Sequence, residues 1–387
     1  MTTIGGRLAA RRGIGPGFDF LRLTLAVSIV AWHTDALISG DGTLDHYWLV
    51  WFPGYAILTM FFALSGFLIA GSAERLSLGN FLINRALRII PALTVEVAFS
   101  AFCLGPAFST LPWRDYISDA LTWHYLTNVV GLINYRLPQV FLQHPTPFIN
   151  LSLWTVPYEY ACYAIMSVLV VLGFLRRPMV LAAGAAAIVA LGLAATSFDI
   201  PAHGSDLLGK VVDHVFVGDR SRLFVGFLLG VLLFVMRDKV PYSHGLACVS
   251  VVICLTLAFI GPADRIGYPV INMIAAPALV YLTGYVGVSN IPALPLYQRG
   301  DYSYGIYLYG FPIQQIIFDL IPLQNPLLQF LLAVPAISVF AALSWHGVEK
   351  PILRMRRHFS FTGRMRLAET TRGSAVRLIS NITEQAN

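Results

Sequence analysis

Long apolar runs recur along the whole chain and constrain its fold more than any other feature. Ten runs are each near the ~20 residues that a helix needs to cross ~30 Å of hydrocarbon, and 221–236 is the shortest of them. They predict an all-α fold, a polytopic membrane bundle of about ten transmembrane helices. The runs lie at 18–39, 52–72, 82–105, 151–175, 178–197, 221–236, 244–261, 267–288, 301–321 and 326–347.

The composition supports this prediction. Apolar residues make up 57% of the 387 residues and charged residues 12%, whereas soluble domains are about 45–50% apolar and about 25% charged. A soluble multidomain protein, a disordered chain and a secreted disulfide scaffold are therefore excluded. No C-x-x-C motif or histidine at metal-ligand spacing accompanies the cysteines, so we interpret them as reduced core residues and predict no metal site. The cysteines are Cys103, Cys162, Cys248 and Cys254.

Basic residues predict which side of the membrane each loop faces. Cytoplasmic loops carry an excess of Lys and Arg, and the segment from Lys350 to the end has eight basic residues against two acidic ones. Ten spans put this segment, the N-terminus, Arg176–Arg177 and Arg237–Lys239 on the cytoplasmic side. Counting 116–134 as an eleventh span would put most of them outside. We therefore expect ten spans with both termini in the cytoplasm.

Three parts follow from this topology: a basic cytoplasmic N-terminus (1–17), a transmembrane domain (18–350) and a basic cytoplasmic tail (351–387). We expect the tail to face anionic membrane lipids rather than nucleic acid. Within the domain, 106–150 is expected to be an extracytoplasmic, partly re-entrant loop, since its prolines would break any helix. A second outer loop is expected at 198–220.

Two ionisable residues in the first run are candidates for function, because charges inside a bilayer are costly. Arg22 and His33 are eleven residues apart, which places them on one helix face about 16 Å apart along the axis. Arg22 would lie near the cytoplasmic edge and His33 in the outer half. A snorkelling anchor and a hydrogen-bonded packing residue are the structural alternatives.

A second pair, Arg85 and Arg88, lies one turn apart at the cytoplasmic start of the third run. Two guanidinium groups at this position could grip the phosphates of a soluble cofactor. The alternative is a positive-inside anchor, which is the commoner use of such residues. The chain has no Gly-rich phosphate loop, so an ATP-driven mechanism has no support.

Glu159 lies one or two turns inside the outer end of the run 151–175. The rise of a helix puts it at about the depth of His33 in the outer leaflet. A carboxylate that orients an imidazole and stabilises its cation is the usual way to make a general base. A buried structural pair is the alternative.

Several sequence blocks together resemble the membrane acyltransferase family three. They run in order from about Phe18 to Pro351: FDFLRLTLAVSIVAWH, FFALSGFLI, NFLINRALRIIPAL, INLSLWTVPYEYACY, SYGIYLYGFPI and GVEKP. Members of this family are bacterial integral-membrane acyltransferases that modify extracytoplasmic sugars. The chain departs from many members at Tyr307–Gly310, where they read Tyr-Leu-Trp-His.

The resemblance implies roles for particular residues. The family's Arg–ten residues–His element falls on Arg22 and His33, its cytoplasmic arginine pair on Arg85 and Arg88, and its Trp…Glu block on Trp154 and Glu159. We accordingly expect His33, Glu159 and Arg22 to be catalytic. Arg22, Arg85 and Arg88 are expected to bind the donor, and Trp154 and Tyr158 to bind the acceptor.

The implied reaction is transfer of an acyl group, acetyl by preference, from cytoplasmic acetyl-CoA to a hydroxyl of an extracytoplasmic glycan. Lipid-linked O-antigen or exopolysaccharide precursors are the first choice of acceptor, and the bacterial cytoplasmic membrane is the expected location. His33 would take the proton of the hydroxyl, or receive the acyl group first, with Glu159 supporting its charge. The sequence leaves two other classes open: a secondary transporter or flippase that uses the same charges as a relay, and a non-catalytic subunit of a polysaccharide export complex.

Overall fold

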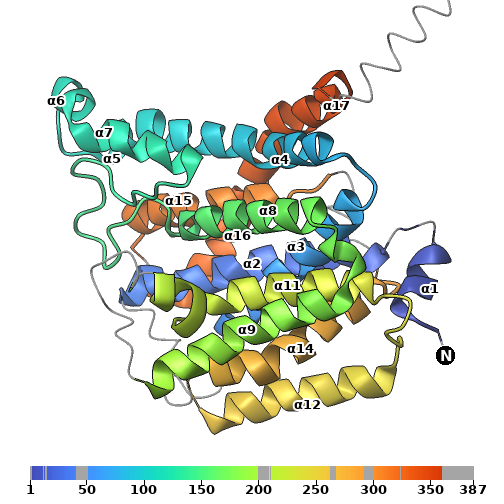
Figure 1. Ribbon diagram of the computed structural model, residues 1–387. Coiled ribbons are helices and arrows are strands. Elements are labelled where there is room, and N and C mark those ends of the chain that lie inside the picture. The colour runs from blue at the N-terminus through green and yellow to red at the C-terminus, as the bar shows by residue number, and fades with distance from the viewer. Residues whose placement is uncertain are drawn as a thin grey trace, which may run out of the picture.

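The protein is a bundle of helices in the computed structural model (Figure 1). The structure describes residues 2–11, 13, 15–40, 51–198, 209, 211–261, 267–291, 300–322 and 324–359. Over these residues the chain forms helices, turns and two isolated bridges, without a β-strand. The predicted tail 351–387 lies outside the described residues beyond Phe359, as do 199–208 and 210 of the second outer loop.

The long helices coincide with the predicted apolar runs. They are α2 (Pro16–Ser39), α3 (Trp51–Ala73), α4 (Leu78–Phe99), α8 (Val156–Val171), α9 (Pro178–Ser197), α11 (Ser221–Val235), α12 (His244–Ile260), α14 (Tyr268–Gly287), α15 (Ser303–Leu320) and α16 (Pro326–Ser344). Shorter helices are α1 (Ile4–Ala9), α5 (Gly105–Phe108), α6 (Trp113–Ser118), α7 (Ala120–Tyr125) and α17 (Lys350–Phe359). The prediction of an all-α membrane bundle is thus confirmed.

Seven segments of the described chain are long and apolar enough to cross a membrane. Helices α11 and α12 are apolar but shorter, and α15 is not among the seven. The count of ten spans therefore stays a prediction. The seven are Pro16–Ser39, Trp51–Ala73, Leu78–Phe108, Leu151–Val171, Pro178–Ser197, Tyr268–Gly287 and Pro326–Met355.

Small residues allow the central helices to pack closely. A Cβ atom at Gly66 of α3 would overlap the backbone carbonyl of Phe227 on α11, and one at Gly230 would overlap the carbonyl of Ala63. Lipid tails are as apolar as the helices, so packing of this kind, rather than a hydrophobic driving force, holds membrane helices together. The two glycines therefore let the backbones of α3 and α11 come into contact.

The two ends of the bundle carry different segments (Figure 1). The end at which α2, α4 and α15 begin, here called the arginine end, also holds α1 and α17. There α1 is tied to the chain after α11, because the N–H of Gly5 donates to the carbonyl of Arg237 at 2.8 Å. Helices α5, α6 and α7 lie at the opposite end, here called the loop end.

Residues 144–155, here called the re-entrant segment, run from the loop end into the bundle alongside α15. His144 contacts Asp319 near the end of α15 at 3.1 Å, and the side-chain amide of Gln315 donates to the carbonyl of Phe148 at 2.6 Å. Deeper in the bundle, Asn150 donates to the carbonyl of Leu308. Positions 319 and 308 of α15 are about 16 Å apart along its axis. Because the re-entrant segment descends this far, α8 begins in the interior of the bundle.

Candidate active site

A cavity of about 350 Å³ lies between α2, α3, α4, α8 and α15. Arginines line one part of it, and mostly apolar residues of α3 form a wall. Several hydroxyl groups and one carboxylate complete the lining. Its lining residues on α3 are Leu58, Phe61, Phe62, Leu64, Ser65, Leu68 and Ile69, and those on the other elements are Arg22, Arg85, Arg88, Ile89, Thr155, Glu159, Tyr163, Ser303, Tyr304 and Tyr307. The structure thus brings Arg22, Arg85, Arg88 and Glu159 to one cavity.

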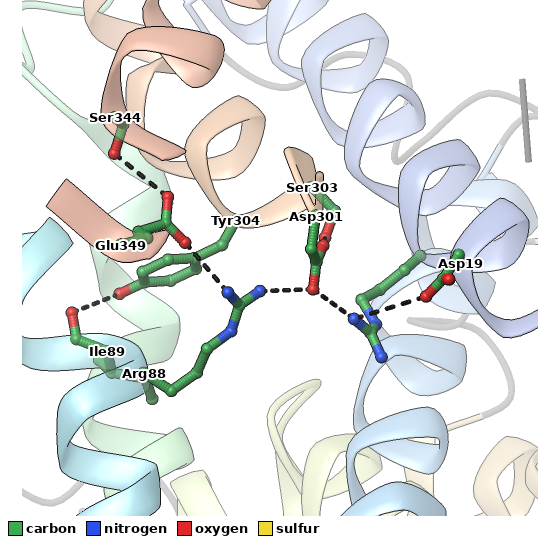
Figure 2. Close-up of polar contacts among 9 residues, drawn as sticks. Asp19, Arg88, Ile89, Asp301, Ser303, Tyr304, Ser344 and Glu349 are labelled. Atoms are coloured by element: carbon green, nitrogen blue, oxygen red, sulfur yellow. Dashed lines mark hydrogen bonds and ion pairs between the residues drawn. The ribbon is translucent and has the colours of Figure 1, made fainter. Parts of the chain in front are cut away.

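Two of these arginines belong to a network of ion pairs (Figure 2). Arg88 lies between two carboxylates: its Nη2 is 2.7 Å from Asp301 Oδ2 and its Nη1 is 3.1 Å from Glu349 Oε2. Arg22 also pairs with Asp301 Oδ2. Asp301 and Glu349 each accept a further hydrogen bond, from Ser303 at 2.6 Å and from Ser344 at 3.2 Å. The charges of Arg22 and Arg88 are therefore matched within the protein.

The network is shielded from solvent on the side of Glu349, whose side chain is 2% exposed. Tyr304 and Trp345 lie near the Arg88 guanidinium, with ring centroids at 5.6 and 5.8 Å. Asp301 and Glu349 were not singled out from the sequence. Each is an acidic residue at the edge of an apolar run, in a chain with only 20 acidic residues, and that signal could have found them.

Arg85 differs from its two neighbours. Its side chain makes no hydrogen bond or ion pair with any residue that the structure describes, and its Nε is buried without a partner. It lines the cavity, and the Glu159 carboxylate acts on it electrostatically. Arg22, Arg85 and Arg88 are here called the arginine cluster. Arg85 is the member whose guanidinium donors remain available to a bound anion.

Glu159 lies in the first turn of α8. Its Oε1 accepts a hydrogen bond of 2.7 Å from the Tyr163 hydroxyl, one turn along the same helix. Glu159 lines the same cavity as Arg85 and Arg88. The carboxylate therefore lies beside the arginine cluster.

His33 lies outside this cavity and closer to the loop end. Its side chain is buried, its ring packs edge-on against Phe311 of α15 at 5.4 Å, and its Nδ1 has no hydrogen-bond partner in the described part of the chain. The neighbouring turn of α2 is fixed by Gln314, which donates to the carbonyl of Val30 at 3.0 Å and to Thr34 at 2.7 Å. The imidazole is thus held by packing, with a free ring nitrogen.

The structure corrects the expected shared depth of His33 and Glu159. His33 is level with Phe311, whereas Thr155, at the start of α8, contacts Tyr307. Glu159 is one turn further toward the arginine end, which separates the two residues by about 12 Å along the bundle axis. Counting residues from the outer end of the apolar run underestimates the depth of Glu159, since the re-entrant segment starts α8 inside the bundle.

The two residues predicted to bind the acceptor lie together but away from the cavity. The rings of Trp154 and Tyr158 contact each other edge-on at 5.8 Å. Arg220, which precedes α11, lies over the Trp154 ring at 5.8 Å, and Tyr158 packs against Phe224. Neither residue lines the cavity.

Comparison with known proteins identifies the family. The family model described as an acyltransferase domain matches residues 16–346, nearly the whole chain. The chain belongs to acyltransferase family three. It is therefore an acyltransferase enzyme with multiple membrane spans.

The relatives of this acyltransferase include O-acetyltransferases. An O-acetyl transferase of Shigella phage Sf6 is 27% identical over 350 residues, which cover 87% of this chain and 95% of that protein. Nodulation protein 10 of Rhizobium leguminosarum bv. viciae is 26% identical over 365 residues, covering 88% of this chain and 93% of that protein. The peptidoglycan O-acetyltransferase of Listeria monocytogenes is 25% identical over 87% of this chain, which spans 55% of it. No solved structure matches the chain significantly.

Proposed function

We propose that this acyltransferase moves an acetyl group from acetyl-CoA, bound at the arginine end, to a hydroxyl of an extracytoplasmic glycan. The observation that carries the proposal is the cavity. Arg85, which pairs with none of the described residues, lies at one end of it, and His33 lies about one turn of helix beyond its other end. The cavity holds the donor, and the loop end admits the acceptor. The named activities of the phage and Listeria relatives support O-acetylation.

Donor binding is assigned to the basic part of the cavity. Arg85 supplies free guanidinium donors, which match phosphate oxygens in charge and geometry. Arg22 and Arg88 line the same part of the cavity, and Asp301 holds both of them in place. Beyond them, the α3 wall of the cavity is aromatic and aliphatic. Such a wall suits the apolar part of the acyl-CoA arm better than it suits a hydrated, polar group.

Acceptor activation is assigned to His33. Its unpartnered Nδ1 is able to take a proton from a sugar hydroxyl, or to receive the acetyl group first and pass it on. In either route the carbonyl carbon loses its bond to the CoA sulfur and gains a bond to the sugar oxygen. The proton of the sugar hydroxyl is transferred to the departing CoA thiolate, which leaves as the thiol.

Glu159 is assigned to the donor side instead of to the support of His33. It lies beside the arginine cluster, about 12 Å from His33 along the bundle axis by helical rise. There its charge acts on Arg85 without a direct ion pair or hydrogen bond between the two described side chains. Trp154 and Tyr158, outside the cavity, remain candidates for contact with the glycan.

The sidedness is part of the proposal. Basic residues gather at the arginine end, among them Arg7, Arg75, Arg176 and Arg237, which fits a cytoplasmic face. The location would then be the bacterial cytoplasmic membrane. Lipid-linked O-antigen or exopolysaccharide precursors are the proposed acceptors, since they present sugar hydroxyls at its outer face.

The experiment is an acetyl-transfer assay on purified protein in lipid nanodiscs, with labelled acetyl-CoA and a panel of lipid-linked glycans. We expect labelled ester on a glycan and stoichiometric release of CoA. His33→Ala should lower kcat by at least about 100-fold, as loss of a general base does, with acetyl-CoA binding retained. Transport of a glycan across the membrane of proteoliposomes that contain the protein, without CoA release, would support the transporter alternative and overturn the proposal. Full activity of a folded His33→Ala protein would remove His33 from the mechanism.

A further inference from the structure

Two hydroxyl groups meet at the part of the cavity that lies furthest along α15 from the arginines. Tyr307 Oη and Thr155 Oγ1 are 2.5 Å apart, and both residues line the cavity. Tyr307 is four residues beyond Ser303, which begins α15 and binds Asp301, and four residues before Phe311, so it is about 6 Å along the axis from each. The hydroxyl pair therefore lies between the arginine cluster and His33.

The re-entrant segment holds this pair in place. Tyr307 Oη donates to the carbonyl of Ser152 at 2.9 Å. Asn150, which is fully buried, accepts from the Ser152 N–H at 3.0 Å and donates to the Leu308 carbonyl at 2.9 Å. Its amide also donates to Glu96 of α4 at 3.0 Å. Contacts to α4 and α15 thus fix the hydroxyls before any ligand arrives.

Fixed donors at this position suit one step of acyl transfer. When an acceptor oxygen attacks a thioester, negative charge develops on the carbonyl oxygen, and preorganised hydrogen-bond donors stabilise it. A donor whose phosphates lie at Arg85 and whose arm follows Phe61 and Phe62 brings its thioester toward Thr155 and Tyr307. The carbonyl carbon of the thioester then lies on the side of the cavity that is nearer to His33.

We propose that the Thr155 hydroxyl, oriented by Tyr307, binds the thioester carbonyl oxygen and stabilises the oxyanion of the transfer step. This inference rests on the proposed acetyl-CoA function. Tyr307 keeps its hydrogen bond to the Ser152 carbonyl and orients Thr155, whose hydroxyl turns from Tyr307 to the substrate oxygen. As the tetrahedral intermediate collapses, the carbon–sulfur bond breaks, the carbonyl re-forms and the acceptor's proton goes to the CoA thiol.

The test uses Thr155→Val and Tyr307→Phe, which remove each hydroxyl with little change in shape. We expect kcat for glycan acetylation to fall by about 100-fold in Thr155→Val, the loss typical of one oxyanion donor. The KM for acetyl-CoA should change by less than about threefold, because the arginine cluster is intact. The double variant should be little worse than Thr155→Val, since the two groups act as one unit.

Tyr281→Phe is the matched control, because Tyr281 also donates to a main-chain carbonyl, that of Pro241, but lies outside the cavity. It should keep the wild-type kcat. Equilibrium binding of labelled acetyl-CoA reports whether each variant is folded. Unchanged kcat in Thr155→Val would overturn this proposal alone, as would a rise in KM without a fall in kcat. A wild-type protein that transfers no acetyl group from acetyl-CoA would overturn the proposed function and this inference with it.

Discussion

The arginine cluster and the re-entrant segment both bury polar groups inside a membrane-spanning bundle, but they satisfy them differently. At the arginine end, charged side chains pair with side chains of opposite charge, and Arg88 binds both Asp301 and Glu349. Along the re-entrant segment, uncharged amides and hydroxyls bind main-chain carbonyls, as Gln315 does with Thr146 at 2.7 Å and Phe148. The segment also contacts two carboxylates, those of Glu96 and Asp319, but through the side chains of Asn150 and His144 instead of through arginines. Non-helical backbone at this depth is tolerated only when the protein itself supplies such partners.

The difference predicts how each region responds to mutation. Removing one member of a buried ion pair leaves an uncompensated charge, whereas removing an amide leaves an unsatisfied but neutral carbonyl. The arginine end is therefore sensitive to which partner is lost, and the re-entrant segment to how many hydrogen bonds are lost. Arg85 is the exception at the arginine end, since it has no partner to leave behind among the described residues.

Arg88→Met should have the largest effect on stability. It leaves the buried Glu349 carboxylate without its cation, which costs about 3–5 kcal/mol for a broken buried pair. The melting temperature of the purified protein checks this. Adding Glu349→Gln removes the stranded charge, so the double variant should regain most of the lost stability. If the single and double variants have the same melting temperature, the Arg88–Glu349 pair contributes little to stability. The arginine end then does not depend on matched charges.

Arg85→Ala should leave the stability of the protein unchanged and weaken the binding of acetyl-CoA. Loss of a charged hydrogen bond to a phosphate is worth about 1.5–3 kcal/mol, so the Kd for acetyl-CoA should rise by about 10- to 100-fold. Equilibrium binding in nanodiscs measures it. Arg85→Lys should restore only part of the affinity, because an ammonium lacks the planar fork. Unchanged affinity would return Arg85 to the role of a membrane anchor.

Gln315→Leu tests the uncharged region. It leaves the Thr146 and Phe148 carbonyls without their shared donor, at a cost of about 1–3 kcal/mol. We expect a smaller fall in melting temperature than for Arg88→Met, and faster hydrogen exchange in residues 146–152. Gln329→Leu is a control from another helix, since it removes a single buried amide contact, to the Gln314 carbonyl. If hydrogen exchange in residues 146–152 stays slow in Gln315→Leu, Gln315 does not stabilise the re-entrant segment.

Glu159→Gln should have the smallest effect. The change removes a charge beside Arg85 but keeps an acceptor for Tyr163, so KM for acetyl-CoA should shift by less than about tenfold, or 1.4 kcal/mol. The pH dependence of kcat should keep its position, because Glu159 is distant from His33. A shift of the profile to lower pH would mean that Glu159 does stabilise the imidazolium. That result would reinstate the pairing expected from the sequence.

The positions of the helices could be predicted from the sequence, but their contacts could not. Apolar length locates each helix, and the run predicted at 178–197 is α9 to the residue, but α8 begins five residues after the start of its run at 151–175. The partners of Arg88 are more than 200 residues away along the chain, and nothing in local periodicity says which helices are neighbours. The depth of Glu159 was missed for a related reason. Residue counting assumes that a helix starts at the membrane surface, and α8 does not.

The entry of the donor at the arginine end is the central claim, and oriented vesicles test it most directly. Acetyl-CoA does not cross bilayers, so it reaches only the face that is exposed. We predict that labelled acetyl-CoA added to inside-out vesicles is consumed with release of CoA, and that sealed right-side-out vesicles release CoA only after permeabilisation. Arg85→Ala should raise the donor concentration that inside-out vesicles require. Equal release from sealed right-side-out vesicles, or no release from either orientation, would contradict the claim.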